Sequence, residues 1–316
     1  MKLLVTGGAG YIGSVVAAQL IIAGHDVVVL DNLSTGHRDA VVDGAQFRQE
    51  ELSHVARVLD GSFDGVLHFA AKSLVAESVG RPEIYWDNNV VGTLALLEAM
   101  RVAGVERLIF SSTAAIYGVP HRVPIREDDP AAPINPYGQT KLAVDMAITG
   151  AAHAHGLAAA SLRYFNVGGA QGGLGERHSP ETHLIPNILQ VPLGIRESVS
   201  IFGTDYDTRD GTCIRDYLHV VDLGRAHLLA LTAVQPGSHN IYNLGSGTGY
   251  TVREVVDSCR RVTGRPVPSV DHGRRGGDPP ALVASSDLIH TELGWKAELD
   301  LDRIVSDSWS FATEHA

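Results

Sequence analysis

The sequence predicts an α/β fold, a doubly wound parallel sheet followed by a smaller α+β C-terminal lobe. Three observations predict it. Short apolar runs alternate with longer helical patterns in the first half, which is typical of a parallel sheet. A glycine-rich turn joins the first apolar run to the first helical pattern. Beyond about residue 170, glycine, proline and histidine become frequent and the expected elements become shorter. We expect a sheet domain over residues 1–170 and a smaller lobe over 171–316, with the chain crossing between them.

The individual elements follow from apolar periodicity and from the glycines that end helices. In the first half we expect strands at residues 2–6, 26–30, 65–70, 107–112 and 157–163, and helices at 13–23, 84–103 and 136–155. In the second half we expect helices at 222–233, 251–263 and 301–313, and strands at 199–202 and 240–244. The second strand is continuous and β-branched, as strands buried on both faces are.

Composition excludes several classes of protein. The 316 residues are 44% hydrophobic and carry a formal net charge of −11, which argues against a nucleic-acid-binding surface. The two cysteines, Cys213 and Cys259, are far apart and predict neither a disulfide framework nor a zinc site. No apolar run approaches the ~20 residues that span a bilayer. Because the sequence leads from Met1 and Lys2 into a strand and a glycine turn, we expect no signal peptide. We expect a cytoplasmic protein that binds no membrane.

The turn from Thr6 to Gly13 follows the first strand and opens the first helix. Glycines at 7, 10 and 13 allow a sharp turn and a close approach to a pyrophosphate, while the helix amino terminus offers free N–H groups. Glycine patterns alone are weak evidence, but the strand–turn–helix context favours a dinucleotide site on a Rossmann-type sheet.

Asp31 ends the second strand, eighteen residues after Gly13. A carboxylate there can accept hydrogen bonds from both hydroxyls of an adenosine ribose. A 2′-phosphate would meet this negative charge, and the nearest following arginine is Arg38. The pattern therefore favours NAD over NADP.

Tyr137 and Lys141 are four residues apart, on one face of the expected helix at 136–155. A free tyrosine has a pKa near ~10, too high for a base at neutral pH. A neighbouring ammonium and an oxidised nicotinamide would both favour the phenolate, which could take a proton from a sugar hydroxyl. Thr113 follows a strand at its carboxyl edge, where open α/β sheets bind ligands, and is the candidate donor to the reacting oxygen.

Beyond these groups, the chain resembles the extended short-chain dehydrogenase/reductase family and, within it, the UDP-glucose 4-epimerases. The resemblance covers nearly the whole length, and the blocks at 163–166, 201–206 and 211–220 indicate the epimerase branch. It rests on Thr6–Gly13, Leu30–Asn32, His68–Ala71, Asp87–Asn89, Phe110–Thr113, Tyr117–Gly118, Asn135–Lys141, Arg163–Asn166, Ile201–Tyr206, Gly211–Val220, Tyr242–Gly245 and Arg274–Pro279.

The resemblance implies an isomerase reaction at C4 of a UDP-hexose. Tyr137 would remove the O4 proton while hydride passes from C4 to bound NAD. The 4-keto sugar would then turn over in the pocket and take hydride back on its other face. UDP-galactose and UDP-glucose would be interconverted without net redox change. The resemblance also implies a homodimer, formed by the helices around residues 84–103 and 136–155.

The site residues that the resemblance implies fall into two sets, with Tyr137, Lys141 and Thr113 as the catalytic group. NAD would contact Gly7, Gly10, Tyr11, Ile12, Gly13, Asp31, Asn32, Ser34, Thr35, Gly36, Glu51, Leu52, Phe69, Ala70, Ala71, Ser73, Asn88, Ser111, Ser112, Tyr137, Lys141 and Tyr164. The UDP-sugar would contact Ser73, Thr113, Ala114, Ala115, Tyr137, Phe165, Asn166, His183, Leu184, Ser200, Ile201, Phe202, Arg215, Tyr217, Val252, Arg275 and Asp278.

The sequence leaves several alternatives open. Either Lys72 or Ser73 faces NAD, because the family lysine aligns with the serine. Leu282 stands where residue size decides whether N-acetylated sugars fit, so UDP-GlcNAc, UDP-pentose and UDP-glucuronate remain candidate substrates. A non-catalytic NAD-sensing protein on the same fold is a further alternative. A 4,6-dehydratase is disfavoured, because alanines rather than acids follow Thr113. No metal is expected, since His178 and His183 lack partner carboxylates at ligand spacing.

Overall fold

The computed structural model describes residues 1–315 and divides the chain into two compact units. The first unit comprises residues 1–119, 127–164 and 224–242, and the second comprises 120–126, 165–223 and 243–316, of which residue 316 is not described. The chain therefore passes between the units several times. Among the described residues, no helix combines the length and the apolar character needed to cross a membrane.

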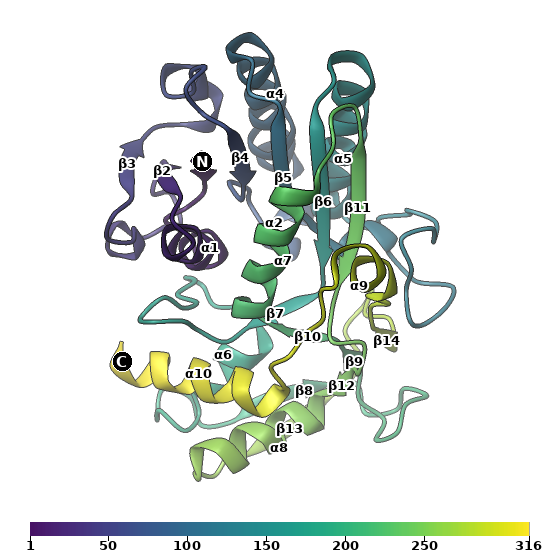
Figure 1. Ribbon diagram of the computed structural model, residues 1–316. Coiled ribbons are helices and arrows are strands. Elements are labelled where there is room, and N and C mark those ends of the chain that lie inside the picture. The colour runs from purple at the N-terminus through teal and green to yellow at the C-terminus, as the bar shows by residue number, and fades with distance from the viewer. Residues whose placement is uncertain (316) are drawn as a thin grey trace. The chain divides into compact units, whose positions relative to one another are not determined.

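The first unit is organised by a seven-stranded sheet, ordered β11-β6-β5-β4-β1-β2-β3 (Figure 1). The strands from β1 to β6 pair in parallel with their neighbours in this order. This is the Rossmann-type doubly wound arrangement expected from the alternating pattern. The strands are β1 (Lys2–Thr6), β2 (Asp26–Asp31), β3 (Gln46–Gln49), β4 (Gly65–His68), β5 (Arg107–Thr113), β6 (Ala158–Tyr164) and β11 (His239–Leu244).

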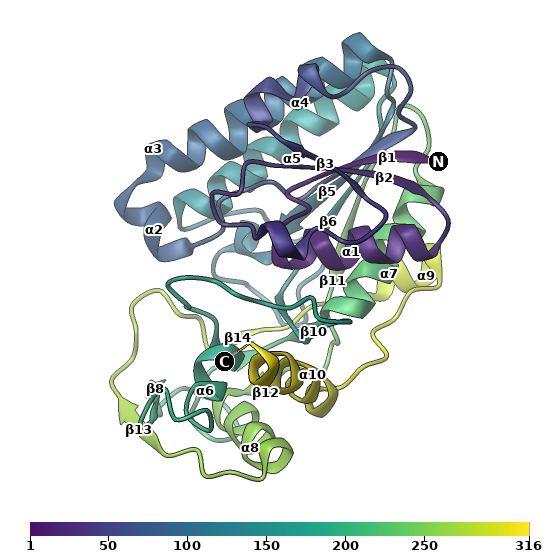
Figure 2. The same cartoon turned by 90° about the vertical axis from the view of Figure 1, so that its left-hand side faces the viewer.

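Helices cover both faces of this sheet. Figure 2 shows α4 (Gly92–Ala103) and α5 (Pro136–His155) on one face and α1 (Tyr11–Ile22) on the other. The side chains of β1, β2, β4 and β5 pack with α4 and α5 in a core of leucine, valine and phenylalanine. The shorter elements of this unit are η1 (Arg38–Ala40), η2 (Leu52–Arg57), α2 (Val75–Gly80), α3 (Pro82–Tyr85), η3 (Trp86–Val91) and η4 (Ala114–Tyr117).

Local signals set the ends of α5, the helix that carries Tyr137 and Lys141. The Asn135 side chain accepts a hydrogen bond from the Gly138 N–H at 2.8 Å, and proline occupies the first helical position. Gly156 ends the helix in the left-handed conformation, with a φ of 76°. These caps explain why the predicted bounds of this helix, 136–155, are confirmed.

The second unit contains shorter elements around a separate core of valine, isoleucine and leucine. Its helices are α6 (Leu184–Leu189), α8 (Val252–Thr263), α9 (Asp287–Leu293) and α10 (Leu301–Glu314), and α7 (Val220–Ala233) starts in it and continues in the first unit. Its strands are β7 (Asn166–Gly168), β8 (Val199–Phe202), β9 (Ile214–Arg215), β10 (Tyr217–His219), β12 (Tyr250–Thr251), β13 (Ser269–His272) and β14 (Ala281–Leu282).

Several predicted bounds are wrong by one or two residues, and one helix is wrong in kind. The expected single helix at 84–103 is α3, a π-helical stretch η3 and α4 in succession. Apolar periodicity cannot distinguish i→i+5 from i→i+4 hydrogen bonding, so a π-helix leaves no sequence signal. The prediction also missed β3, which is polar and partly exposed, and α6, which follows a segment rich in glycine and proline.

Candidate active site

The glycine turn forms a close-packed cradle at the carboxyl end of β1. Gly7 adopts a φ of +72°, and a Cβ added there would lie 2.6 Å from the Ala70 nitrogen. A Cβ on Gly13 would lie 2.3 Å from the Gly7 carbonyl oxygen. Gly10 caps α1 without any side-chain hydrogen bond, and the amino terminus of a helix is a favourable place for an anion. The residues present therefore fit a bound pyrophosphate.

Asp31 is held in a fixed orientation at the end of β2. Its Oδ2 accepts a hydrogen bond from the Ala9 N–H at 3.0 Å, and its Oδ1 accepts one from the Leu33 N–H at 2.8 Å. A Cβ on Gly36 would lie 3.0 Å from the same Oδ1. Each carboxylate oxygen keeps a second lone pair for a ribose hydroxyl. This geometry fits the adenosine end of a dinucleotide.

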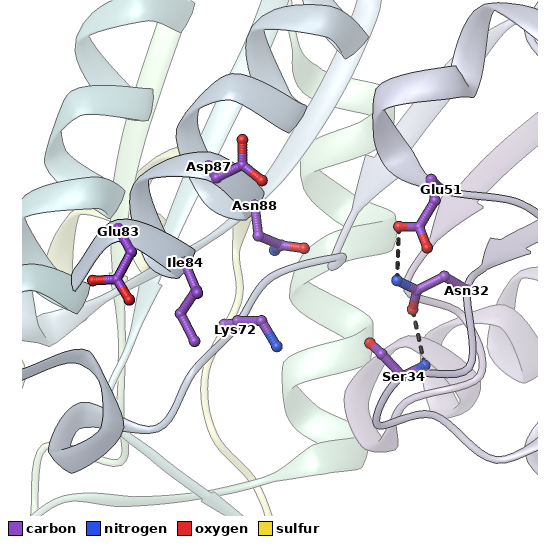
Figure 3. A pocket seen from close by; sticks show the side chains of 8 residues that line it. All are labelled: Asn32, Ser34, Glu51, Lys72, Glu83, Ile84, Asp87 and Asn88. Carbon is purple, nitrogen blue, oxygen red and sulfur yellow. Dashed lines mark hydrogen bonds between the residues drawn. The ribbon is translucent and has the colours of Figure 1, made fainter. Parts of the chain in front are cut away.

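A pocket opens next to Asp31 in the first unit (Figure 3). Four residues expected to contact NAD line it: Asn32, Ser34, Glu51 and Asn88. The Asn32 amide donates to Glu51 at 2.9 Å and accepts from the Ser34 N–H at 2.9 Å, which fixes the wall of the pocket. Lys72, which the sequence left open as an alternative to Ser73, also lines the pocket. Sequence reasoning missed three further lining residues: Glu83, Ile84 and Asp87. These three residues lie one to five positions before Asn88, so their proximity to it was the available signal.

All the predicted NAD residues lie in the first unit. Five members of the substrate set lie there too: Ser73, Thr113, Ala114, Ala115 and Tyr137. Strand registers place Thr6 opposite His68 and Thr113 opposite Tyr164, so these carboxyl ends share one edge of the sheet. The NAD set comprises the turn and first residues of α1, the loop after β2, Glu51–Leu52 at the start of η2, residues 69–73 after β4, Asn88 in η3, Ser111–Ser112 in β5, Tyr137 and Lys141 in α5, and Tyr164 in β6.

Tyr137, Lys141 and Thr113 come together at this edge. Burial raises the pKa of the Tyr137 phenol to about 12, and its hydrogen bond with the Thr113 side chain lowers it. The Lys141 Nζ lies 6.0 Å from the centre of the Tyr137 ring and donates to the Ser111 carbonyl at 2.7 Å. Burial lowers the pKa of Lys141 to about 7, and the charge of Asp145 opposes that shift. Burial therefore dominates at the phenol, and additional positive charge is needed to favour the phenolate.

Arg163 and Asp145 form a buried ion pair close enough to Lys141 for the Asp145 charge to act on its pKa. Sequence reasoning missed this pair. The Arg163 Nε and Nη2 donate to the Asp145 Oδ2 at 3.1 and 2.9 Å. The Arg163 Nη1 also donates to the Tyr117 hydroxyl at 2.9 Å. Asp145 follows Lys141 by four residues, so helical spacing was a usable signal for it. Ser112, expected at NAD, donates to the same Asp145 oxygen at 3.4 Å and is buried.

In the second unit, four residues of the predicted substrate set cluster. The Arg275 Nε lies 2.9 Å from the Asp278 Oδ2, and the Arg215 Nη2 lies 3.4 Å from its Oδ1. The Arg275 guanidinium also sits 5.6 Å from the centre of the exposed Phe202 ring. Two arginines beside an exposed aromatic ring have the chemistry to hold a nucleoside diphosphate.

The remaining substrate residues lie elsewhere in this unit. Asn166 donates through its amide to the Asp216 carbonyl at 3.0 Å, and Tyr217 is buried in the core. Phe165 lies between β6 and β7, Ser200 and Ile201 in β8, and Val252 at the start of α8. Tyr217 is packed against hydrophobic side chains, so its position in the structure is that of a core residue.

His183 and Leu184 stand at the start of α6, where the structure corrects one sequence argument. The argument against a metal, that His178 and His183 have no partner carboxylates at ligand spacing, is wrong. Glu176 lies within ion-pair distance of both histidines, and Glu181 lies within ion-pair distance of His183. The sequence positions of the two glutamates were visible, but the loop conformation that folds them together was not.

Comparisons with known proteins identify the family of this chain. A model of the NAD dependent epimerase/dehydratase family matches residues 3–245. The UDP-glucose 4-epimerase of Corynebacterium glutamicum is 55% identical over 316 residues, which cover 99% of this chain and 96% of that protein. The UDP-glucose 4-epimerase of Streptomyces lividans is 57% identical over 319 residues, covering 99% and 97%.

A solved structure gives the same result. The crystal structure of Brucella ovis UDP-glucose 4-epimerase in complex with NAD matches with a TM-score of 0.93 at 45% identity, covering 98% of this chain and 97% of that one. The chain therefore belongs to the NAD dependent epimerase/dehydratase family and, within it, to the UDP-glucose 4-epimerases.

Proposed function

We propose that this chain interconverts UDP-galactose and UDP-glucose by inverting C4 of the hexose, with NAD held permanently in the first unit. The observation that carries the proposal is the Tyr137 phenol, hydrogen-bonded to Thr113 with the Lys141 ammonium nearby, at the sheet edge that also bears the glycine cradle. A proton acceptor, an orienting hydroxyl and a cofactor cradle in one unit are what transient oxidation of a sugar carbon requires.

Each group of the triad has one role in the proposal. Tyr137 takes the O4 proton and later returns it to the same oxygen. Thr113 donates a hydrogen bond to O4 and keeps it beside the phenol. Lys141, anchored on the Ser111 carbonyl, stabilises the phenolate through its charge. The cofactor, when bound, accepts the C4 hydride and gives it back.

The arginine cluster of the second unit is proposed to hold the diphosphate. Arg215 and Arg275 now share Asp278, so a bound diphosphate would compete with that carboxylate for the guanidinium groups. Asp278 would then be available to accept a hydrogen bond from a ribose hydroxyl, and Phe202 would contact the base. Exchange of one anion for another keeps the charges paired at every stage.

Other UDP-sugars are the second candidate substrates, because of Leu282. This residue pairs with Arg215 in the β14–β9 register, so it lies directly beside the proposed diphosphate clamp. A leucine is intermediate in size between a small residue and tyrosine. Parallel assays with UDP-GlcNAc, a UDP-pentose and UDP-glucuronate compare these substrates with UDP-galactose.

A cytoplasmic homodimer completes the proposal. Large apolar side chains are exposed on the helices expected to form the interface, including Trp86, Val91, Leu94 and Met146, which are 41 to 67% exposed. Exposed apolar patches of this kind mark association surfaces. Sedimentation velocity of the wild type and of Leu94→Glu measures the association; a wild type that sediments as a monomer contradicts it.

The reaction itself is tested by proton NMR of UDP-galactose mixed with the purified protein, without added cofactor. The proposal predicts that anomeric signals of UDP-glucose grow until an equilibrium mixture is reached. Bound nucleotide, released by denaturation, should amount to about one NAD per chain. An unchanged spectrum from protein that carries NAD would rule the proposal out.

A further inference from the structure

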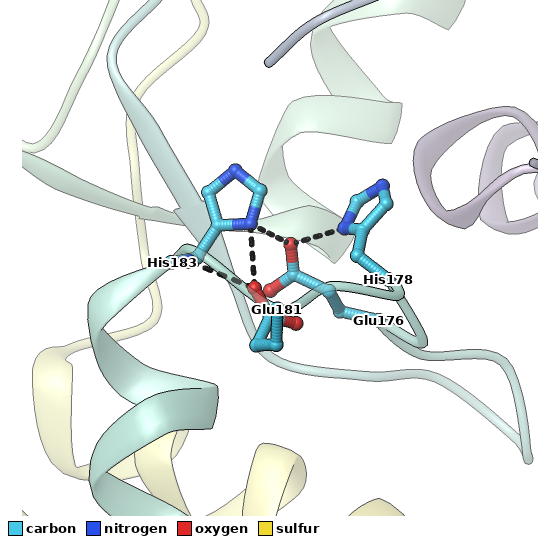
Figure 4. Close-up of side chains that lie close together, drawn as sticks. All are labelled: Glu176, His178, Glu181 and His183. Carbon is cyan, nitrogen blue, oxygen red and sulfur yellow. Dashed lines mark hydrogen bonds and ion pairs between the residues drawn. The ribbon is translucent and has the colours of Figure 1, made fainter. Parts of the chain in front are cut away.

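Four side chains of a single loop point toward one another in the second unit, just before α6. They are Glu176, His178, Glu181 and His183, and Figure 4 shows both imidazoles turned toward the Glu176 carboxylate. One nitrogen or oxygen from each lies within 4.8 Å of the others. The donor set is therefore two imidazole nitrogens and two carboxylate oxygens, supplied by eight consecutive residues.

The distances are close to those of a tetrahedral metal site. The His183 Nδ1 lies 2.7 Å from the Glu176 Oε1 and 3.0 Å from the Glu181 Oε1, and the His178 Nδ1 lies 3.0 Å from the Glu176 Oε1. Zinc at about 2.0–2.1 Å from each donor places neighbouring donors about 3.3 Å apart. These three contacts need shifts of a few tenths of an ångström to reach that spacing, and the other donor pairs, which lie within 4.8 Å, need at most about 1.5 Å.

The charges also favour a cation at this point. The Glu176 and Glu181 side chains are only 8 and 9% exposed, so two carboxylates are brought close together largely out of water. A divalent ion would balance the charge of these two carboxylates and bind all four donors at once.

The surroundings orient one of these donors and leave a path for entry. The Glu181 Oε1 accepts backbone N–H bonds from Thr182 and His183, both at 2.7 Å, which fix the carboxylate as outer hydrogen bonds fix metal ligands. The His183 side chain is 42% exposed, so an ion can reach the centre from solvent.

We propose that Glu176, His178, Glu181 and His183 bind one divalent transition-metal ion, with zinc as the best match to the donors. Mixed imidazole and carboxylate ligands suit zinc, whereas calcium and magnesium prefer oxygen ligands alone. The ion would tie the loop to His183, the residue that caps α6, whose Ile185, Ile188 and Leu189 pack in the core. Its role is to hold this loop in place, and the inference does not depend on which sugar the protein epimerises.

The test uses the full-length protein with its NAD, treated with EDTA, desalted and titrated with zinc chloride by calorimetry near neutral pH. We expect saturable binding of one zinc per chain and a higher midpoint of thermal unfolding with zinc than with EDTA. His178→Ala and Glu176→Gln should each weaken binding by at least about tenfold, since each removes a ligand. The control His153→Ala/His155→Ala removes exposed histidines at the end of α5 and should bind zinc like the wild type.

Cobalt substitution gives the coordination directly. The wild type should show the intense visible bands of four-coordinate cobalt, and His178→Ala should lose them. His178 is partly exposed, so this variant decides the matter even if Glu176→Gln fails to fold; its thermal unfolding in EDTA checks its integrity. Absence of saturable binding in the wild type, or equal affinity in His178→Ala, would show that the cluster is an ion-pair network alone.

Discussion

The catalytic region of the first unit and the arginine cluster of the second unit differ in how far their charged side chains are exposed to solvent. Lys141 is 2% exposed and Tyr137 is partly buried, and burial shifts the pKa of both groups strongly. The Arg275 side chain is 64% exposed and its charge is matched by Asp278. Buried groups have altered acidity and suit proton transfer, whereas exposed, paired groups can exchange partners and suit ligand binding. Substitutions should therefore change rate in the first region and binding in the second.

The largest effect is expected at the phenol. Tyr137→Phe removes the proton acceptor but keeps the ring, so kcat should fall by about 10²–10⁴ while bound NAD remains at the wild-type level. Turnover of UDP-galactose and the nucleotide content of the purified variant measure the two quantities. A variant that keeps its NAD and more than a tenth of the wild-type kcat would break the comparison.

The second-largest effect is expected on thermal stability, at the buried ion pair between Asp145 and Arg163. Asp145→Asn leaves the Arg163 guanidinium without its anionic partner, which costs about 3–5 kcal/mol when such a pair is buried. The midpoint of thermal unfolding should therefore fall by several degrees. The matched control is Arg101→Gln, which breaks the exposed pair with Glu98 and should leave the midpoint unchanged. Equal effects of the two substitutions would contradict the role of burial.

Substitution in the arginine cluster should raise KM for the UDP-sugar. Arg275→Ala removes one charged donor to the diphosphate, and the loss of such a contact raises KM by about ten- to a hundredfold with little change in kcat. Steady-state kinetics with UDP-galactose separate the two parameters. The opposite pattern, a fall in kcat at unchanged KM, would place Arg275 in the chemistry rather than in binding.

The smallest effect is a change in acidity. In protein stripped of NAD, burial keeps the pKa of Tyr137 near about 12, so the phenol is protonated at every pH below 10. Positive charge favours the anion, and oxidised NAD should lower that pKa by at least about one pH unit. The difference in absorbance at 295 nm between wild type and Tyr137→Phe follows the phenolate. A titration curve that NAD leaves unmoved would contradict the activation proposed for this residue.

Elements set by nearby residues could be predicted from the sequence. The turn at Gly7–Gly13 needs only the spacing of three glycines between a strand and a helix, and Asn135 and Gly156 mark the ends of α5. Four-residue spacing on that helix placed Tyr137 and Lys141 on one face, and the end of β5 placed Thr113 beside them.

Features that depend on contacts between distant residues or on the pattern of backbone hydrogen bonds could not be predicted from the sequence. Arg163 meets Asp145 because β6 lies against α5, a contact between residues eighteen positions apart that no local pattern shows. The π-helical stretch Trp86–Val91 has the composition of an ordinary helix. The loop before α6 brings Glu176 to both histidines through its fold, whereas spacing alone suggested that no carboxylate was in reach.

The central claim, that NAD stays in the glycine cradle and returns the hydride it receives, is tested most directly with UDP-galactose deuterated at C4. The protein, carrying only the NAD with which it was purified and mixed with a pool of unlabelled NADH in solution, should convert it to UDP-glucose that keeps the deuterium at C4. Proton NMR of the product reads this position. Protium at C4 of the product would show that the hydride leaves the site, and the resident-cofactor mechanism would then be wrong.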